Sequence, residues 1–521
     1  MVYESFGKIT KITGSKVIVQ VQVSDAVNKV SIDSFVLNYI SIGALLGTRL
    51  VDGRTLVLTV EEIYEHEDGE YINAAISGIY DNVLKKFSFG TDSYPLIGEK
   101  VFSLHNEVLS HIFMPKYGHG TNMGSSIGTY IYDDSVQVGY NPDVLFGKHL
   151  GVYGNTGSGK TCTVVSIIQR YIRENPGKDI KFIILDVNGE YKTAFNEEEC
   201  EYYSFDSLRF NHTILSNIEY QKLFRAADGI QYPVLRDCIR KLKNENPVWD
   251  LNDLEGSLDS WVIEHTPNNQ YGKKDVFQSN NLFANLRPML LRIESITSDA
   301  ELINVINTVG DNTLDKIMSS QKKVHILDLQ VSVDSLDIVL YLLFKTIYQY
   351  KVQQRKEVYP NPTHLTLVLE EAHRYINSNL EETKLGNYYI DKLSREGRKF
   401  GIGLIISSQV PSMLSQEIVS QCNSVIMHKI TSKRDMEFLR GVLRISNDAF
   451  YLQMSALEKQ HAIVCGEAFA NDTIVRVHDA MPLPMSNDPA IDDIALFEES
   501  DKPALAIRGE IEAKVTEAYG E

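Results

Sequence analysis

Two patterns of hydrophobic and polar positions divide the chain into regions. Over residues 1–98, apolar and polar residues alternate in short runs, as in FGKITKITGSKVIVQVQ from Phe6, and turn signals separate the runs. Short alternating strands at this spacing are typical of a small β-barrel. Residues 99–148 follow as a connector, which is poor in apolar residues around KYGHGTNMGSS. We therefore expect an N-terminal β-barrel and a connector that leads into the rest of the chain.

From residue 149 onward, short apolar runs alternate with stretches of helical spacing. A parallel sheet with crossover helices produces this pattern, because strands covered on both faces are apolar throughout. We expect an α/β core over residues 149–480. Its predicted strands are HLGVY (149–153), KFIILDVNGEY (181–191), KVHILDLQ (323–330), HLTLVLEEAHRYI (364–376), FGIGLIISSQ (400–409), SVIMHKI (424–430) and HAIVCGEA (461–468).

Two segments depart from this alternation. Between about 205 and 320 the strand-like runs stop, and stretches such as LFRAADGIQYPVLRDCIRKLKNEN carry helical spacing, which predicts a helical insertion in the core. Residues 481–521 contain prolines and then many acidic residues. For this last segment we expect a C-terminal tail or an arm that lies on a neighbouring molecule.

The composition is that of an ordinary globular protein with an acidic balance. The 521 residues are 43% hydrophobic and 23% charged, and the formal net charge is −18. This charge argues against a protein that coats nucleic acid with its outer surface, but it permits a local basic channel. No apolar run reaches the roughly 18 residues of a membrane span, and the five cysteines are scattered without metal-ligand spacing. We expect a protein of the reducing cytoplasm.

The stretch HLGVYGNTGSGKTCTV, residues 149–164, carries the strongest chemical signal. Its glycines, followed by Lys160 and Thr161, fit the phosphate-binding P-loop, in which glycines let backbone N–H groups turn toward a phosphate. Lys160 would reach the β- and γ-phosphates of ATP, and the Thr161 hydroxyl would hold Mg²⁺. The alternative is a glycine-rich turn without a ligand. The predicted nucleotide-binding residues are Gly154, Asn155, Thr156, Gly157, Ser158, Gly159, Lys160, Thr161 and Cys162.

Hydrolysis also needs carboxylates, and LTLVLEEAHRY supplies two of them at the predicted end of a strand. Glu370 would face the water shell of Mg²⁺, completing a metal site with Thr161, and Glu371 would polarise the attacking water. The alternative for both is the polar start of a helix. Gln409 follows another predicted strand, in LIISSQVPSML, and is a candidate sensor of the γ-phosphate; its alternative is a capping amide.

Basic residues in LSREGRKFGIG, residues 393–403, suggest an arginine finger. Arg395 and Arg398 precede a predicted strand, which places them on the wrong side of the core for their own site but suits a ring with sites between subunits. Arg434 is a second finger candidate, and solvated helix ends are the alternative for these residues. Candidates for DNA contacts in a pore are Arg374, Lys384 and Lys392, with solvated helix faces as the alternative.

At these residues the sequence resembles the HerA ATPases of the HerA/FtsK superfamily. The resemblance rests on LGVYGNTGSGKT, ILDVNGEY, LVLEEAHRYI and LSREGRKFGIGLIISSQVPSMLSQEIVSQCNSVIMHKI, and it covers most of the chain. It implies a HAS-type β-barrel, a RecA-like P-loop core with a helical insertion, and a homohexameric ring. It further implies ATP-driven translocation of double-stranded DNA through the central pore, and a C-terminal segment that braces the neighbouring subunit.

The same resemblance implies roles for individual residues, with two departures from the family pattern. Asn188 stands where the family often has histidine, which leaves the role of that loop open. Glu370 stands where aspartate is more usual in Walker B, and its longer side chain should still reach the metal through water. The residues matched to Walker A, Walker B, the sensor and the trans finger are Lys160, Thr161, Glu370, Glu371, Gln409 and Arg395 or Arg398.

HerA-like motors usually work with a second protein, and we find no acidic cluster typical of a nuclease in this sequence beyond the ATPase residues. The resemblance implies a NurA-like or other nuclease in DNA end processing, or a sirtuin-like NAD-consuming enzyme in antiviral defence, docked on the barrel. Two alternatives to a translocase stay open. One is a nucleotide-switched ring that assembles an effector; the other is a conjugation-type secretion or coupling ATPase, which the lack of a membrane segment disfavours.

Overall fold

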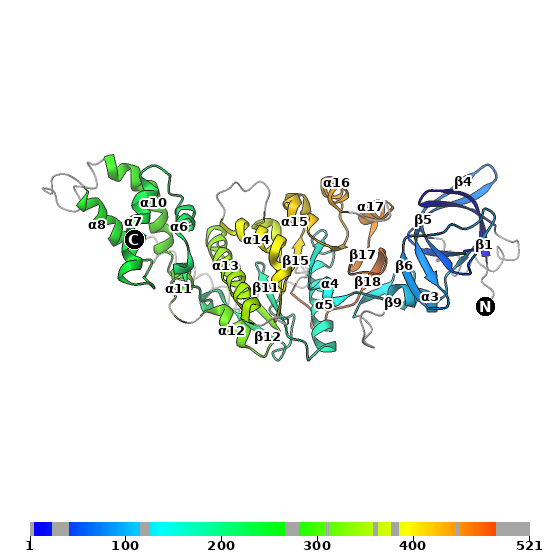
Figure 1. Cartoon of the computed structure of the whole chain (residues 1–521), viewed down its shortest axis with the longest axis horizontal. Helices are drawn as coiled ribbons and strands as arrows, with labels where there is room; N and C mark the ends of the chain where they lie inside the picture. Colours follow the sequence, from blue (N-terminus) through cyan, green and yellow to red (C-terminus); the bar gives the residue numbers. More distant parts are fainter. Residues whose placement is uncertain are drawn as a thin grey trace, which may run out of the picture. The chain divides into compact units, whose positions relative to one another are not determined.

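The computed structural model describes residues 5–22, 41–114, 125–265, 281–308, 310, 312–357, 363–376, 385–443 and 449–485. These residues belong to one compact unit, Met1–Met485. Two β-sheets carry its fold, one in the N-terminal barrel and one in the core (Figure 1). Among the helices described, none is both long and apolar enough to cross a lipid bilayer.

The N-terminal sheet closes on itself, which confirms the predicted β-barrel. Its strand order is β2-β1-β7-β3-β4-β5, β2 also pairs with β5, and β6 extends the sheet beyond β5. Alternate side chains such as Val17 and Val19 of β2 fill the interior together with Leu46 and Leu58. The strands are β1 (Ser5–Thr13), β2 (Lys16–Val21), β3 (Leu45–Arg49), β4 (Thr55–His66), β5 (Gly69–Asp81), β6 (Lys86–Phe89) and β7 (Lys100–Ser103), followed by helix α3 (Asn106–Phe113).

The core sheet has 11 strands in the order β12-β13-β11-β14-β15-β10-β16-β17-β18-β8-β9. Neighbours from β12 to β16 run parallel, which confirms the α/β core, and every residue of β10, β11, β15 and β16 is buried. The parallel strands are β10 (His149–Tyr153), β11 (Ile180–Asp186), β12 (Cys200–Tyr203), β13 (Val324–Asp328), β14 (His364–Leu369), β15 (Ile402–Ser408) and β16 (Ser424–Met427).

One end of the core sheet differs from the sequence expectation. The predicted strand HAIVCGEA is β17, and it runs antiparallel to β16. Three further strands continue the antiparallel pairing, and the last two form a hairpin inside the predicted connector. Strand direction is set by the connection and not by the apolar pattern, so the run alone could not reveal it. These strands are β17 (His461–Gly466), β18 (Thr473–Val477), β8 (Ser126–Tyr130) and β9 (Asp133–Gly139).

Helices cover both faces of the core sheet. Along β11, Ile183 and Leu185 join one hydrophobic cluster, and Phe182 and Ile184 join the other. The first cluster holds the buried side chains of α13 and α14, and the second holds those of α5. The core helices are α4 (Pro142–Leu145), α5 (Lys160–Glu174), α13 (Val333–Glu357), α14 (Leu385–Glu396), α15 (Gln416–Ser420), α16 (Lys433–Val442) and α17 (Ala449–Gln453).

A helical segment lies between β12 and β13, where the sequence predicts an insertion. Ser216 caps its first helix in a capping box with Glu219. The Glu219 carboxylate also accepts hydrogen bonds from Tyr341 Oη and, at 2.5 Å, from Lys345 Nζ, so it ties the segment to α13. The helices are α6 (Asn217–Leu223), α7 (Gln231–Glu245), α8 (Asp253–Glu264), α10 (Asn281–Thr297), α11 (Ala300–Ile306) and α12 (Thr313–Ser319).

After β18 the chain runs along α5, and we call residues 479–485 the strap. The Gln169 side chain pairs with the strap backbone through both of its ends, donating to Pro482 O at 2.9 Å and accepting from Met481 N at 2.7 Å. Arg173 Nη1 donates to Met481 O at 2.8 Å. The strap ends with Met485 N donating to Glu190 O at 2.8 Å. Later residues of the chain therefore fasten α5 to the loop that follows β11.

Candidate nucleotide-binding site

The predicted phosphate-binding loop lies where several parallel strands end. Residues 154–159 connect the carboxyl end of β10 to α5, and β10 lies between β15 and β16. The carboxyl ends of β11 and β14 are at the same edge, because all these strands run parallel. Ligands of open α/β sheets bind at this edge.

The loop has the backbone that a phosphate cradle needs. Gly157 and Gly159 have φ of 69° and 112°, which few residues other than glycine adopt. A Cβ on Gly154 would lie 2.6 Å from His428 Cβ, so the chain passes too close for a side chain. The first helical hydrogen bond runs from Thr163 N to Gly159 O, at 2.9 Å. The positive N-terminal end of α5 thus faces the loop, where it favours an anion.

Lys160 is buried beside the loop. Its Nζ donates to Asn155 O at 3.2 Å, and its side chain is only 5% exposed. Burial lowers the pKa of Lys160, and the negative charges of Glu371, Glu370 and Glu190 oppose that shift. A buried amine among carboxylates fits a group that receives the charge of a nucleotide phosphate.

Thr161 has a carboxylate partner that the sequence did not single out. Its Oγ1 donates to Glu190 Oε2 at 2.8 Å. Glu190 lies in the loop after β11, and burial raises its pKa. The signal was present in ILDVNGEY, where a glutamate follows a buried strand, but spacing alone does not show which carboxylate contacts the P-loop. A threonine hydroxyl with nearby carboxylates is a donor set that Mg²⁺ accepts.

Glu370 lies at the end of β14, buried and occupied on both oxygens. Tyr191 Oη donates to Glu370 Oε2 at 2.6 Å, and Ser407 Oγ donates to Oε1 at 3.2 Å. Burial raises the pKa of Glu370 to about 7, although the Tyr191 hydrogen bond acts in the opposite direction. The hydrogen bonds from Tyr191 and Ser407 thus hold the Glu370 carboxylate at the candidate site.

Glu371 and Gln409 meet directly, and they join the P-loop. The backbone of Glu371 is left-handed, with φ 45°, and leads into the short 3-10 helix η3 (Ala372–Arg374). Gln409 Nε2 donates to Glu371 Oε1, and Gln409 Oε1 accepts from Thr156 Oγ1. His373 Nδ1 lies 3.2 Å from Glu371 Oε2 and 3.2 Å from Ser408 Oγ, and burial lowers the pKa of His373. One amide therefore bridges the phosphate loop and the second carboxylate.

The first pair of finger candidates lies at the opposite edge of the sheet. Arg398 is in the 3-10 helix η4 (Gly397–Phe400), just before β15, and its Nη2 donates to Gln421 O at 2.6 Å. Arg395 is exposed and pairs with Asp391, with Nε 2.9 Å from Oδ1. The seven residues of β15 separate this edge from the P-loop by about 20 Å. Neither arginine can therefore reach the P-loop of its own chain.

Arg434 lies at the edge of the sheet that carries the P-loop. It is exposed in the first turn of α16, which begins shortly after β16. The connection between β16 and α16 touches the P-loop, where Asn155 N donates to Lys429 O at 2.8 Å and Asn155 Nδ2 donates to Thr431 Oγ1 at 2.9 Å. The structure thus separates the two groups of finger candidates onto opposite sides of the core.

The remaining predicted residues are spread over the core. Arg374 Nη1 donates to Val187 O at 3.2 Å and to Asn188 Oδ1 at 3.1 Å, so it holds the loop after β11. Lys392 Nζ lies 4.2 Å from the centre of the Tyr348 ring. Cys162 is half-buried in the first turn of α5. Lys384 lies outside the described residues.

Comparison with known proteins points to one family. Residues 125–347 match the family model of the HerA helicase central domain. Together with the curated relatives, this match supports a HerA-type ATPase. This ATPase is 27% identical over 399 residues to the DNA double-strand break repair helicase HerA of Sulfurisphaera tokodaii, with 74% of each chain covered. Its identity to the protein of the same name from Saccharolobus solfataricus is 26% over 422 residues, with 79% of each covered. The predicted family and ATPase activity are thereby confirmed.

Among solved structures, the HerA-type ATPase matches VirB4 of Thermoanaerobacter pseudethanolicus with a TM-score of 0.49 and 12% identity. The match covers 70% of this chain and 99% of that one.

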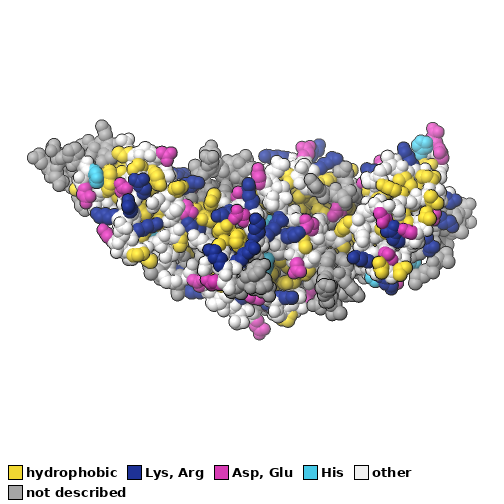
Figure 2. Space-filling model, viewed as in Figure 1, with side chains coloured by type: hydrophobic (Ala, Val, Ile, Leu, Met, Phe, Trp, Pro, Cys, Tyr) yellow, Lys and Arg dark blue, Asp and Glu magenta, His cyan; other side chains and the backbone are white. Residues whose placement is uncertain are grey.

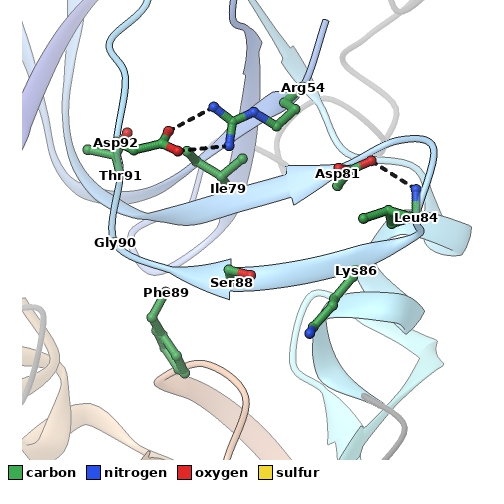
Figure 3. A pocket seen from close by; sticks show the side chains of 10 residues that line it. All are labelled: Arg54, Ile79, Asp81, Leu84, Lys86, Ser88, Phe89, Gly90, Thr91 and Asp92. Atoms are coloured by element: carbon green, nitrogen blue, oxygen red, sulfur yellow. Dashed lines mark hydrogen bonds and ion pairs between the residues drawn. The ribbon is translucent and has the colours of Figure 1, made fainter. Parts of the chain in front are cut away.

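A separate cavity of about 610 Å³ opens on the barrel and not at the P-loop (Figure 3). Leu84, Phe89 and Ile79 line it, and Arg54 at its rim is paired with Asp92, whose Oδ1 lies 2.8 Å from Arg54 Nη2. Two of these apolar side chains are strongly exposed, Leu84 at 73% and Phe89 at 65%, whereas Ile79 is buried. Figure 2 shows hydrophobic side chains on the surface of the barrel, at the right of the view.

Proposed function

We propose that this HerA-type ATPase is a motor that translocates double-stranded DNA through a homohexameric ring. The bridge from Thr156 through Gln409 to Glu371 is the observation that carries the proposal, because it links the phosphate loop to the residue that would act on water. The similarity to the Sulfurisphaera relative, a DNA double-strand break repair helicase, supports DNA as the track.

In this proposal the chain's own residues bind ATP and prepare water for attack. The P-loop backbone and Lys160 hold the β- and γ-phosphates, and Thr161 holds Mg²⁺, which neutralises phosphate charge when bound. Glu371 orients the attacking water and takes up its proton, while Gln409 fixes the Glu371 carboxylate and registers the γ-phosphate. Glu370 remains predicted to face the water shell of Mg²⁺.

The ring supplies the arginine. Arg398 and Arg395 each lie about one strand length from the P-loop of their own chain, so they cannot serve their own site. In a ring, one of them would reach the ATP of the neighbouring subunit instead. The Nε atom of Arg398 is buried and has no hydrogen-bond partner among the described residues, so one donor of the guanidinium lacks an acceptor there. We propose Arg434 as the alternative finger. Arg374, Lys384 and Lys392 are proposed as DNA contacts.

The second candidate function is a nucleotide-switched ring that assembles an effector without processive movement. The exposed apolar side chains around the barrel cavity favour it, since Val83 is 90% exposed and Leu84 73%. In either function we propose that this part of the barrel docks a protein effector, a nuclease such as a NurA-like one or a sirtuin-like NAD-consuming enzyme. End processing and antiviral defence are the two processes proposed for such a pair.

ATP turnover with and without duplex DNA distinguishes the two functions. We expect duplex DNA to stimulate the wild type, Lys160→Ala to abolish nucleotide binding, and Glu371→Gln to reduce turnover by about 100-fold or more while binding persists. Turnover that is slow and identical with and without DNA, together with ATP-dependent capture of an effector, would favour the scaffold.

A further inference from the structure

The loop that follows β11 brings two successive side chains, those of Glu190 and Tyr191, to the ATPase site. The Glu190 carboxylate accepts the hydrogen bond of the Thr161 hydroxyl at 2.8 Å. The Tyr191 hydroxyl donates to Glu370 at 2.6 Å. The two carboxylates near the predicted metal position therefore have different partners. Glu190 accepts a hydrogen bond from Thr161 of the P-loop, and Glu370 accepts one from Tyr191.

The position of Glu190 is held from several directions. The Asp186 carboxylate accepts four backbone N–H bonds from the loop, from Asn188, Gly189, Glu190 and Tyr191. Arg374 holds Val187 and Asn188 from the side of η3. The strap holds the Glu190 carbonyl through Met485 N, at 2.8 Å. A loop fixed at both sides and along its backbone keeps its side chain in one place.

The direction of the Thr161 hydrogen bond determines what the hydroxyl can offer a metal. A hydroxyl has one proton and two lone pairs. When Glu190 takes the proton, the lone pairs of Thr161 Oγ1 remain for a cation, and the negative charge behind the proton makes the oxygen a better donor of electron density. Glu370 has no described hydrogen bond to Thr161, because its oxygens hold Tyr191 and Ser407.

We propose that Glu190, and not Glu370, is the carboxylate that orients Thr161 toward Mg²⁺. Glu190 is then a positioning residue, since it acts through Thr161 and does not itself touch the nucleotide. This inference rests on the proposed function only in requiring that a metal–nucleotide complex binds at the P-loop. It gives a role to ILDVNGEY, whose loop the sequence left open.

The test measures the metal dependence of nucleotide binding and not turnover. The full-length chain is titrated with a fluorescent, non-hydrolysable ATP analogue, first in EDTA and then at increasing Mg²⁺. We expect Glu190→Gln to raise the half-saturating Mg²⁺ concentration by about tenfold or more, with binding in EDTA equal to that of the wild type. Glu370→Gln should shift it less than Glu190→Gln does, because the Glu370 carboxylate accepts from Tyr191 and Ser407 and not from Thr161. Glu198→Gln, an exposed glutamate shortly after the loop, is the matched control.

Equal binding in EDTA shows that the Glu190 variant is folded. Glu190→Asp keeps the charge on a shorter arm, and a shift between those of wild type and Glu190→Gln would support the proposal. A half-saturating Mg²⁺ concentration unchanged in Glu190→Gln, or a larger shift in Glu370→Gln, would overturn it while leaving the proposed motor intact. A wild-type chain that binds no nucleotide at all would instead overturn the proposed function.

Discussion

At the scale of single residues, the candidate nucleotide-binding site depends on contacts between groups that are far apart in sequence. Thr156 and Glu371 are joined only because Gln409, at the end of a third segment, places its amide between them. An amide can serve both partners at once, since it donates to the carboxylate and accepts from the hydroxyl.

Gln409→Glu tests that bridge. The new carboxylate would face the Glu371 carboxylate at hydrogen-bond distance, and like charges there repel. We expect the turnover number to fall by about tenfold or more while nucleotide binding, which depends on Lys160 and the loop, changes little. Turnover and binding are measured on the same preparation, with the exposed Gln416→Glu as the control. A variant that loses binding and turnover equally would show that Gln409 acts on the loop and not on the water.

Glu370 makes stability depend on pH. Burial raises its pKa to about 7, whereas an unfolded glutamate titrates near 4.3. Between these values the folded protein holds a proton that the unfolded chain has released, so this residue's contribution falls as the pH rises from about 4.3 to about 7. Relative to the wild type, Glu370→Gln should therefore gain stability as the pH rises through this range, reaching up to about 4 kcal/mol above pH 7.

Urea unfolding of both proteins between pH 4 and pH 8 measures this difference. A difference in unfolding free energy that does not change with pH would mean that the pKa of Glu370 is the same in the folded and the unfolded protein.

At the scale of elements, the apolar pattern predicted where the buried strands lie. It could not specify which segments of the chain meet in the fold. Buried runs such as β10 and β15 are recognisable because both faces are covered, and carboxylates after β14 mark a strand end. The hairpin β8–β9 was missed because SIGTY and DDSVQVG are short and mostly polar. Glu190 was missed for another reason: its partner Thr161 is far away in sequence, and only the fold brings them together.

Strand β15 also shows how closely elements pack. A Cβ on Gly403 would lie 1.8 Å from Phe146 O, so Gly403→Ala must displace the backbone. We expect it to destabilise the protein by more than about 2 kcal/mol. Gly441, in α16, has open space where a Cβ would go. Gly441→Ala should therefore stabilise slightly, by up to about 1 kcal/mol. Thermal unfolding of the two variants compares them, and similar melting temperatures would contradict the predicted contact.

At the scale of the whole molecule, the separation between Arg398 and the P-loop means that a single chain has an incomplete site in the proposed ring. Subunit mixing tests this. Lys160→Ala chains and Arg398→Ala chains should each be inactive, but an equal mixture should regain activity at about a quarter of its sites, where an intact lysine meets an intact neighbouring arginine. Mixed rings that form but stay inactive would refute a shared site. The same mixture made with Arg395→Ala or Arg434→Ala identifies the arginine.

The strap has a consequence for how the protein is made. Strand β18 pairs Val475 with Tyr130 of β8, and Met485 then fastens the loop of Glu190. A ribosome adds roughly 5–20 residues per second, so the hairpin of β8 and β9 waits on the order of tens of seconds for its neighbour in the sheet. The phosphate loop emerges early in synthesis, yet its surroundings are finished only by some of the last residues described. A nascent or prematurely terminated chain would thus carry the glycines and the lysine without the assembled pocket around them.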